Sequence, residues 1–271
     1  DSWVHKNNPG LATHKAKDLV RMAVGKASLM APLKEAELDV TQTAMVVGGG
    51  IAGMAAARSL ARQGYDTHIV ERSDRLGGQA LNLFRTAKGE DVRQQLSALT
   101  AEINGHEKIR VHLNSTIAKV EGFVGSFKTT LASGEELSHG VAVMATGGSP
   151  YTPTEYAYGT DPRIVTSLEL DRRLMAGDPA LKSLSSAVFI QCVGSREPER
   201  PYCSRVCCTH SVDNAVHLKE MNPEMNVFVL YRDLRTYGER ELLYKKARGL
   251  GVVFIRFGRD RKPQVRIEGG K

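Results

Sequence analysis

The four cysteines of the chain lie within one short stretch and have the spacing C-x10-C-x3-C-C. They are Cys192, Cys203, Cys207 and Cys208. A [4Fe-4S] cluster takes four cysteine ligands and tolerates irregular spacing, so these thiolates suit such a metal centre. The cluster core and its thiolates are together anionic, and nearby cations and a helix N-terminus would offset that charge. The nearby cations are Arg196, Arg200 and Arg205.

Two other uses of these cysteines stay open at this point. A structural zinc site also takes four cysteines, although the usual paired C-x2–4-C spacing is absent. A redox disulfide between Cys203 and Cys207 or a neighbour is the second, although enzymes with a dithiol in such a domain use C-x-x-C. Inert buried thiols are the least favoured use, because cytosolic chains do not gather all their cysteines in one turn by accident.

A glycine-rich stretch predicts a second site. Gly48, Gly50 and Gly53 fit the pattern G-x-G-x-x-G directly after the apolar run Ala44–Val47. The first glycine allows a sharp turn, the second lets the backbone approach a pyrophosphate, and the third lets a helix pack close to the strand. The pattern therefore predicts a strand, a dinucleotide-binding turn and a helix.

The residues after this turn complete the dinucleotide pattern. The helix N-terminus at Ile51 and Ala52 offers free N–H groups and a partial positive charge to phosphates. A second strand then ends at Glu71, which lies 23 residues after Gly48. Its carboxylate is positioned to accept hydrogen bonds from an adenosine ribose.

A glycine doublet, Gly77-Gly78, is a second sequence feature that favours phosphate binding. Adjacent glycines expose backbone N–H groups without obstruction by side chains. With Arg72 ahead of it and Gln79 behind it, the doublet resembles a motif of two-domain flavoproteins. A plain NAD-binding domain has no use for this loop here, so we expect FAD.

Two further segments belong to the same predicted flavin site. Gly140–Gly148 is predicted to be a buried strand that runs into Ala145, Thr146 and Gly147, and it resembles the A-T-G motif of the same flavoproteins. There a small residue and a glycine let the chain pass the cofactor. In flavin domains of this build the backbone near Ile117 commonly faces the adenine.

Residues 44–184 are predicted to form the first part of the FAD-binding domain and a connector. We expect a helix over residues 89–103 and then a small antiparallel meander of four strands. The meander strands are expected at residues 109–113, 117–122, 127–131 and 136–137. Residues 149–184 are punctuated by proline and glycine and hold one short helix near residues 167–175.

Residues 185–271 are predicted to form a second Rossmann-like domain that carries the cysteines. Strands alternate with helices in the order β-α-β-α-β, and Gly194 stands alone where a dinucleotide turn would be. The expected strands cover residues 187–190, 226–231 and 252–257, and the expected helices residues 206–221 and 236–249.

Residues 1–43 are predicted to form an arm and a basic amphipathic helix from about Ala12 to Leu33. Such a helix can lie on a membrane surface or dock on its own protein or a partner subunit. Docking is favoured, because the apolar face is rich in alanine and lacks bulky aromatic residues.

The length, composition and charge of the chain limit its number of domains, its location and the ligands it can bind. The chain has 271 residues and is 41% hydrophobic, enough for two modest domains with their own cores. No apolar run has membrane-spanning length and no secretory signal is present, so we expect a soluble, cytoplasmic protein. The net charge of +7 permits an anionic cofactor or an acidic partner, while sparse aromatic residues argue against nucleic-acid binding. A start at Asp1 without methionine suggests a piece of a longer or split polypeptide.

Several segments together resemble the A subunit of heterodisulfide reductase. They are SWVH, KAKDLVRMAV, VVGGGIAGMAAA, LGGQ, ATGG, PTEYAYG and QCVGSREPERPYCSRVCC. Related flavoproteins of quinone-interacting oxidoreductase complexes share much of this pattern. The resemblance implies a FAD-binding, thioredoxin-reductase-like α/β core with two Rossmann-like units and a [4Fe-4S] cluster on the four cysteines. It also implies a multi-subunit complex in which flavin splits electron pairs between two paths.

We therefore predict an electron-transfer flavoprotein. No general acid, base or nucleophile stands out, which fits a protein whose chemistry belongs to its cofactors. The alternative enzyme is a pyridine-nucleotide disulfide oxidoreductase with a cysteine dithiol, although the missing second glycine turn argues against NAD(P). The non-enzymatic alternative is a structural subunit with a degenerate flavin fold.

Overall fold

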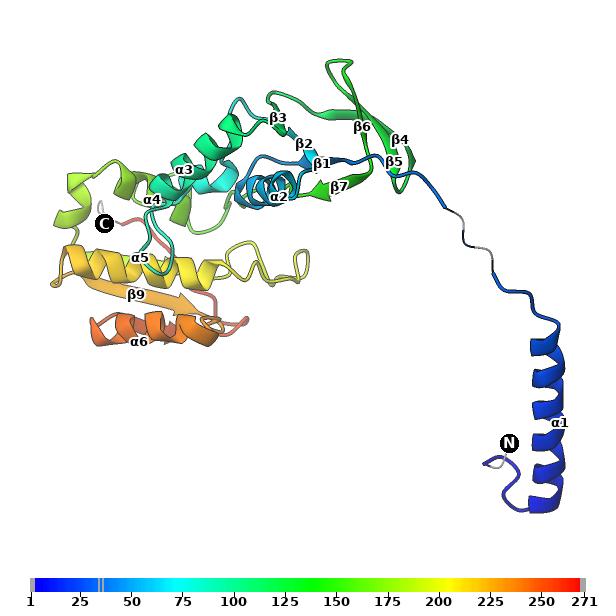
Figure 1. Cartoon of the computed structure of the whole chain (residues 1–271). Helices are drawn as coiled ribbons and strands as arrows, with labels where there is room; N and C mark the ends of the chain where they lie inside the picture. Colours follow the sequence, from blue (N-terminus) through cyan, green and yellow to red (C-terminus); the bar gives the residue numbers. More distant parts are fainter. Residues whose placement is uncertain (1–2, 34, 36, 269–271) are drawn as a thin grey trace. The chain divides into compact units, whose positions relative to one another are not determined.

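The computed structural model describes residues 3–33, 35 and 37–268 (Figure 1). The chain divides into two compact units, residues 1–39 and residues 40–271. No helix in the described part of the chain is long and apolar enough to cross a membrane.

Helix α1 (Pro9–Ser28) is the regular element of the first unit. It begins where the side chain of Asn8 accepts the N–H of Leu11 at 3.3 Å, with Pro9 at the first helical position. The helix ends earlier than the predicted boundary at Leu33. The reason is Pro32, because the residue before a proline is disfavoured in the helical conformation and a proline interrupts the hydrogen-bond ladder.

The second unit contains a parallel sheet in the order β3-β2-β1-β7. Its strands are β1 (Thr43–Val47), β2 (Asp66–Val70), β3 (Ile109–His112) and β7 (Val141–Met144). Helices α2 (Ile51–Arg62) and α3 (Val92–Gly105) pack on each other, and their apolar residues form one core with those of the sheet. The strands all run the same way, so their carboxyl ends and the loops that follow meet at one edge.

The predicted four-stranded meander was wrong in its first strand. β3 pairs parallel with β2, as in Ile69 opposite Val111, and belongs to the sheet above. The α3 crossover between β2 and β3 requires the parallel pairing, because a long helical connection returns a chain to the same end of a sheet. The antiparallel meander consists of β4 (Ile117–Phe123), β5 (Ser126–Leu131) and β6 (Glu136–His139).

A second parallel sheet follows the connector, in the order β10-β9-β8. Its strands are β8 (Ser186–Ile190), β9 (Asn226–Tyr231) and β10 (Val253–Arg256). Helices α5 (Cys207–Met221) and α6 (Glu241–Gly249) pack on each other and share one core with the sheet. The prediction of two parallel, Rossmann-like α/β units is therefore confirmed.

Four short elements lie outside the two sheets, and two of them, α4 and η2, lie between β7 and β8. In the connector, α4 (Ser167–Met175) begins with a capping box, in which Thr166 and Glu169 satisfy each other's backbone N–H groups. The remaining elements are 3-10 turns. They are η1 (Gly78–Asn82), η2 (Pro179–Ser183) and η3 (Gly238–Arg240).

A buried polar junction joins the segment after η1 to helix α5. Arg85 forms an ion pair with Asp213 at 3.1 Å, and the two side chains are 18% and 6% exposed. Burial raises the pKa of Asp213, and the Arg85 guanidinium opposes this shift. Beside this pair, the buried Asp171 of α4 accepts the N–H of Phe84 at 3.1 Å and a hydrogen bond from His210 at 2.9 Å.

Replacing Arg85 with methionine should lower the free energy of unfolding by about 3–5 kcal/mol, because it leaves the Asp213 carboxylate buried without its cation. Urea denaturation at pH 7 measures this loss. The control is Lys128→Met, which breaks an exposed ion pair with Glu136 at 2.7 Å and should change stability by no more than about 1 kcal/mol. Equal effects of the two variants would contradict the assignment.

Candidate functional site

The protein's own packing requires two glycines of the first turn. Gly48 directly follows β1 with φ of +107°, and a Cβ there would overlap the carbonyl oxygen of Ala145. A Cβ on Gly53 would overlap the carbonyl oxygen of Gly48. Helix α2 can therefore start this close to the end of β1 only with glycine at both positions.

Gly50 is different, because no protein atom forces a glycine there. Its φ of −76° and ψ of −177° suit any residue, and the nearest atom to a Cβ would be Cα of Gly78 at 4.0 Å. The doublet lies opposite, and the Gly77 N–H donates to the carbonyl of Gly49 at 2.8 Å. Two segments without side chains thus face each other beside the N-terminus of α2, in a cradle that fits a pyrophosphate.

Glu71 braces this turn from the end of β2. Its buried carboxylate accepts the N–H of Gly49 at 2.6 Å and the N–H of Ser73 at 2.8 Å. Burial acts to raise the pKa of Glu71, but the two backbone donors outweigh it and hold the pKa below its ordinary value of 4.5. Each carboxylate oxygen keeps a lone pair for a further donor, such as a ribose hydroxyl.

The glycine doublet is tied to the segment after β7. The Gln79 side chain donates from Nε2 to the carbonyl of Gly148 at 3.2 Å. The Ala145 N–H donates to the carbonyl of Val47 at 2.8 Å, which holds the A-T-G segment beside β1. Thr146 and Gly147 are exposed beside this link, so the predicted wall residues lie at the same edge of the sheet as the cradle.

The last two residues of the predicted flavin site differ in their surroundings. Arg72 is exposed directly after Glu71. Ile117 begins β4 and packs against the cluster that contains Met45 and Val70. The Ser115 N–H donates to the Glu71 carbonyl at 2.9 Å, so the start of β4 is held close to the acid. A role of Ile117 toward an adenine stays a prediction.

The cysteines occupy the equivalent place in the second sheet, between β8 and α5. Cys192 follows β8 after one residue, and Cys207 and Cys208 open α5. Three sulfur atoms accept hydrogen bonds from nearby groups. The pairs are Arg196 Nη1 to Cys192 at 3.9 Å, the Arg205 N–H to Cys203 at 3.3 Å, and Ser204 Oγ to Cys207 at 3.5 Å.

The adjacent thiols of Cys207 and Cys208 shift each other's pKa in opposite directions. A hydrogen bond from Cys208 and a second from Ser204 lower the pKa of Cys207 to about 6, although burial opposes this shift. The pKa of Cys208 is raised, because its proton is held by Cys207. Burial also raises the pKa of Cys192, the hydrogen bond from Arg196 opposes this shift, and the charge of Cys207 adds to it.

The spacing of the four cysteines allows a zinc site or a four-iron cluster. Within residues 3–33, 35 and 37–268, no three His, Cys, Asp or Glu side chains are placed to hold a single ion. The described side chains therefore show neither a zinc site nor a cluster site at the cysteines. In a four-iron cluster each cysteine binds a different iron atom, and hydrogen bonds to the sulfurs tune the centre. The donors at Cys192, Cys203 and Cys207 fit such thiolate ligands.

A polar network that sequence reasoning missed holds this cysteine loop. Arg232, 6% exposed, donates to the carbonyl of Arg196 at 2.9 Å and pairs with Glu197. Arg196 in turn pairs with Asp233 at 2.6 Å, and the Asp233 carbonyl accepts the Cys208 thiol at 3.8 Å. The available signal was the charged run R-D-L-R directly after β9.

Comparisons with known proteins show which families and folds the chain is similar to. The family described as NAD(P)-binding Rossmann-like domain matches residues 46–104. The chain is 30% identical to the A subunit of the H(2):CoB-CoM heterodisulfide,ferredoxin reductase of Methanothermobacter marburgensis, over 94% of this chain and 53% of that protein. It is 28% identical to an iron-sulfur A subunit of the CoB--CoM heterodisulfide reductase of Methanopyrus kandleri, over 94% of this chain and 54% of that protein. The chain is a relative of the heterodisulfide reductase A subunits.

The chain spans about half the length of the curated relatives that it matches. Its fold is that of thioredoxin reductase. The structure of T. acidophilum thioredoxin reductase matches with a TM-score of 0.52 and 14% identity, over 81% of this chain and 64% of that chain. Lactococcus lactis thioredoxin reductase matches with a TM-score of 0.50 and 17% identity, over 82% of this chain and 69% of that chain.

Glu71→Gln should destabilise the protein by about 1–3 kcal/mol at pH 7, because the N–H groups of Gly49 and Ser73 lose their charged acceptor. The folded-state pKa of Glu71 lies below 4.5, so its contribution is complete above pH 4.5 and is lost as the pH falls through the folded-state pKa. Urea denaturation across that range should show the gap between wild type and variant narrowing. The exposed Glu107→Gln is the control, and a gap independent of pH would contradict the assignment.

Proposed function

We propose that this chain is a FAD- and [4Fe-4S]-containing electron-transfer subunit of a heterodisulfide-reductase-type oxidoreductase complex. The observation that carries the proposal is the pair of sites at equivalent strand-to-helix turns, one without side chains and one rich in sulfur. The curated relatives support it, since both are named as reductase subunits and one as an iron-sulfur subunit. The thioredoxin-reductase-like fold agrees with a flavoprotein.

The first site would hold the ADP half of FAD. N–H groups of Ile51 and Ala52 at the start of α2 would donate to the pyrophosphate, which would lie beside the contact between Gly50 and Gly78. The carboxylate of Glu71 would accept from the ribose. The remaining residues of the site would line the cofactor. They are Gly48, Gly53, Arg72, Gly77, Gln79, Ile117, Ala145, Thr146 and Gly147.

The second site would hold the cluster on Cys192, Cys203, Cys207 and Cys208. Bound FAD would exchange hydride or electron pairs, the cluster would pass single electrons, and the two together would permit flavin-based bifurcation. The hydrogen bonds from Cys208 and Ser204 lower the pKa of Cys207, which favours the thiolate form that a metal ligand needs. The guanidinium of Arg196 would offset the negative charge of the centre. We place this subunit in a cytoplasmic hetero-oligomer.

A specific observation favours one alternative. Cys207 is an acidic thiol beside Cys208, and the fold is that of a disulfide reductase, so a pyridine-nucleotide disulfide oxidoreductase would use these sulfurs as a dithiol. The iron content decides between the two functions, because a dithiol enzyme purified without oxygen contains none.

Gly50→Thr should lower the affinity for FAD at least about tenfold, because its side chain fills the cradle that the pyrophosphate would occupy. Threonine caps a helix about as well as glycine, so the melting temperature should stay unchanged. Flavin absorbance per chain and thermal unfolding measure the two effects. Gly105→Ala is the matched control, because nothing lies within 4 Å of its Cβ. Full flavin occupancy in Gly50→Thr would refute the cradle.

Cys207→Ser should remove the cluster and leave FAD bound, because serine replaces a thiolate ligand while the first site is untouched. Iron, sulfide and flavin per chain in oxygen-free protein measure this. Ser204→Ala is the control, because it removes only a hydrogen bond to the sulfur and should keep the iron. Unchanged iron in Cys207→Ser would exclude the assignment, and iron-free wild type would favour the dithiol enzyme.

A further inference from the structure

Helix α1 carries a continuous apolar stripe along one side. The members recur at helical spacing and are Ala12, Ala16, Leu19, Val20, Ala23, Val24 and Ala27. Within this helix Ala12 is buried, whereas Val20 and Val24 are 62% and 63% exposed. The stripe is therefore open within its own unit.

The stripe repeats every 11 residues. Within α1, Ala12 recurs as Ala23 and Ala16 as Ala27. An 11-residue period amounts to about 3.67 residues per turn, so the stripe runs nearly parallel to the helix axis and suits lengthwise packing against another helix. Alanine fills both repeated pairs, which lets a second helix approach closely.

Both borders of the stripe are basic. Lys15 and Lys26 lie on one border, and Lys17 and Arg21 on the other. Residues 3–33 contain five basic residues and one acidic residue, Asp18, which pairs with Arg21 at 3.0 Å. A matching surface therefore needs acidic residues on both sides of an apolar seam.

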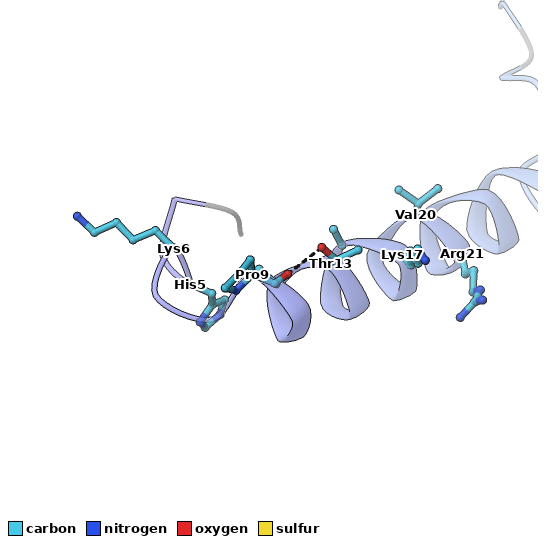
Figure 2. A pocket seen from close by; sticks show the side chains of 9 residues that line it. His5, Lys6, Pro9, Thr13, Lys17, Val20 and Arg21 are labelled. Carbon is cyan, nitrogen blue, oxygen red and sulfur yellow. Dashed lines mark hydrogen bonds between the residues drawn. The ribbon is translucent and has the colours of Figure 1, made fainter.

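A groove of about 770 Å³ runs along the first half of the stripe (Figure 2). Ala12, Ala16 and Val20 line it, with Lys17 and Arg21 at its border. The Thr13 hydroxyl donates to the Pro9 carbonyl at 2.8 Å, so its hydrogen bond is made within the helix. The groove is thus lined both by apolar side chains and by the cations Lys6, Lys17 and Arg21.

We propose that α1 docks lengthwise against an acidic amphipathic helix of a partner subunit. The identity of that partner as a member of the complex rests on the proposed function. A second copy of α1 would place cations opposite cations on both borders. Residues 40–271 are themselves net basic, with 31 Lys and Arg against 25 Asp and Glu. An anionic membrane is disfavoured, because the stripe is rich in alanine and has no aromatic residue to insert.

Site-specific photo-crosslinking in the intact complex tests this contact. A benzoylphenylalanine at Ala23 probes the stripe, and the same residue at His14 probes the opposite side of α1. Ala23 should crosslink to one helical segment of another subunit with Asp or Glu flanking an apolar seam, at least tenfold more than His14. Crosslinks to lipid, to a second copy, or to residues 40–268 would overturn the proposal, as would none in an intact complex.

A charge reversal gives the second test. Lys17→Glu with Arg21→Glu should weaken the affinity for the partner by at least tenfold, whereas Lys182→Glu with Lys245→Glu should leave it unchanged. Equal effects of the two double substitutions would overturn the proposal. The proposal would also be overturned if the wild-type protein bound vesicles of phosphatidylcholine and phosphatidylglycerol and Lys17→Glu with Arg21→Glu abolished that binding. Flavin and iron are measured on the same samples, so a chain that docks but lacks both refutes the proposed function alone.

Discussion

The backbone of Gly53 lies against the carbonyl group of Gly48, and the rest of the first site depends on this contact. A methyl group on either glycine would overlap main-chain atoms of the turn or of Ala145. The strand β1, the helix α2 and the segment after β7 keep their positions only because those side chains are absent. Since β1 lies between β2 and β7, the contact also sets the edge of the sheet from which Glu71 and Thr146 reach the site.

The strand, turn and helix of the first candidate site could be predicted from the sequence because they are set by short-range geometry. The turn, the helix after it and the acid after β2 follow one another along the chain, so their spacing encodes their positions. The strand β3 was misassigned for the opposite reason. An alternating run such as Ile109–His112 suits parallel and antiparallel pairing equally, and the crossover helix α3 decides between them. The ends of α1 follow from nearby residues, because the Asn8 side chain caps its first turn and Pro32 prevents it from extending to Leu33.

The surroundings of the cysteines could not be predicted, because their partners come from distant parts of the chain. Arg196 pairs with Asp233, and Glu197 pairs with Arg232, each across more than thirty residues. An arginine as buried as Arg232 is rare unless it is paired, and composition alone does not say which acid pairs with it. The gathering of the thiols was visible in the sequence, whereas the charge distribution among them depends on the fold.

The cysteine loop and the glycine turn meet backbone constraints in opposite ways. Cys192, Arg196 and Arg205 adopt φ values of +63°, +59° and +62°, a region that favours glycine. Glycine would relax the backbone at each position, but it would remove a sulfur atom at Cys192 and a guanidinium group at Arg196. A backbone held in this region persists only where surrounding contacts over-determine it, and the pairing of Arg196 with Asp233 supplies one such contact. The first turn is therefore shaped by the absence of side chains, and the second by the need to keep them.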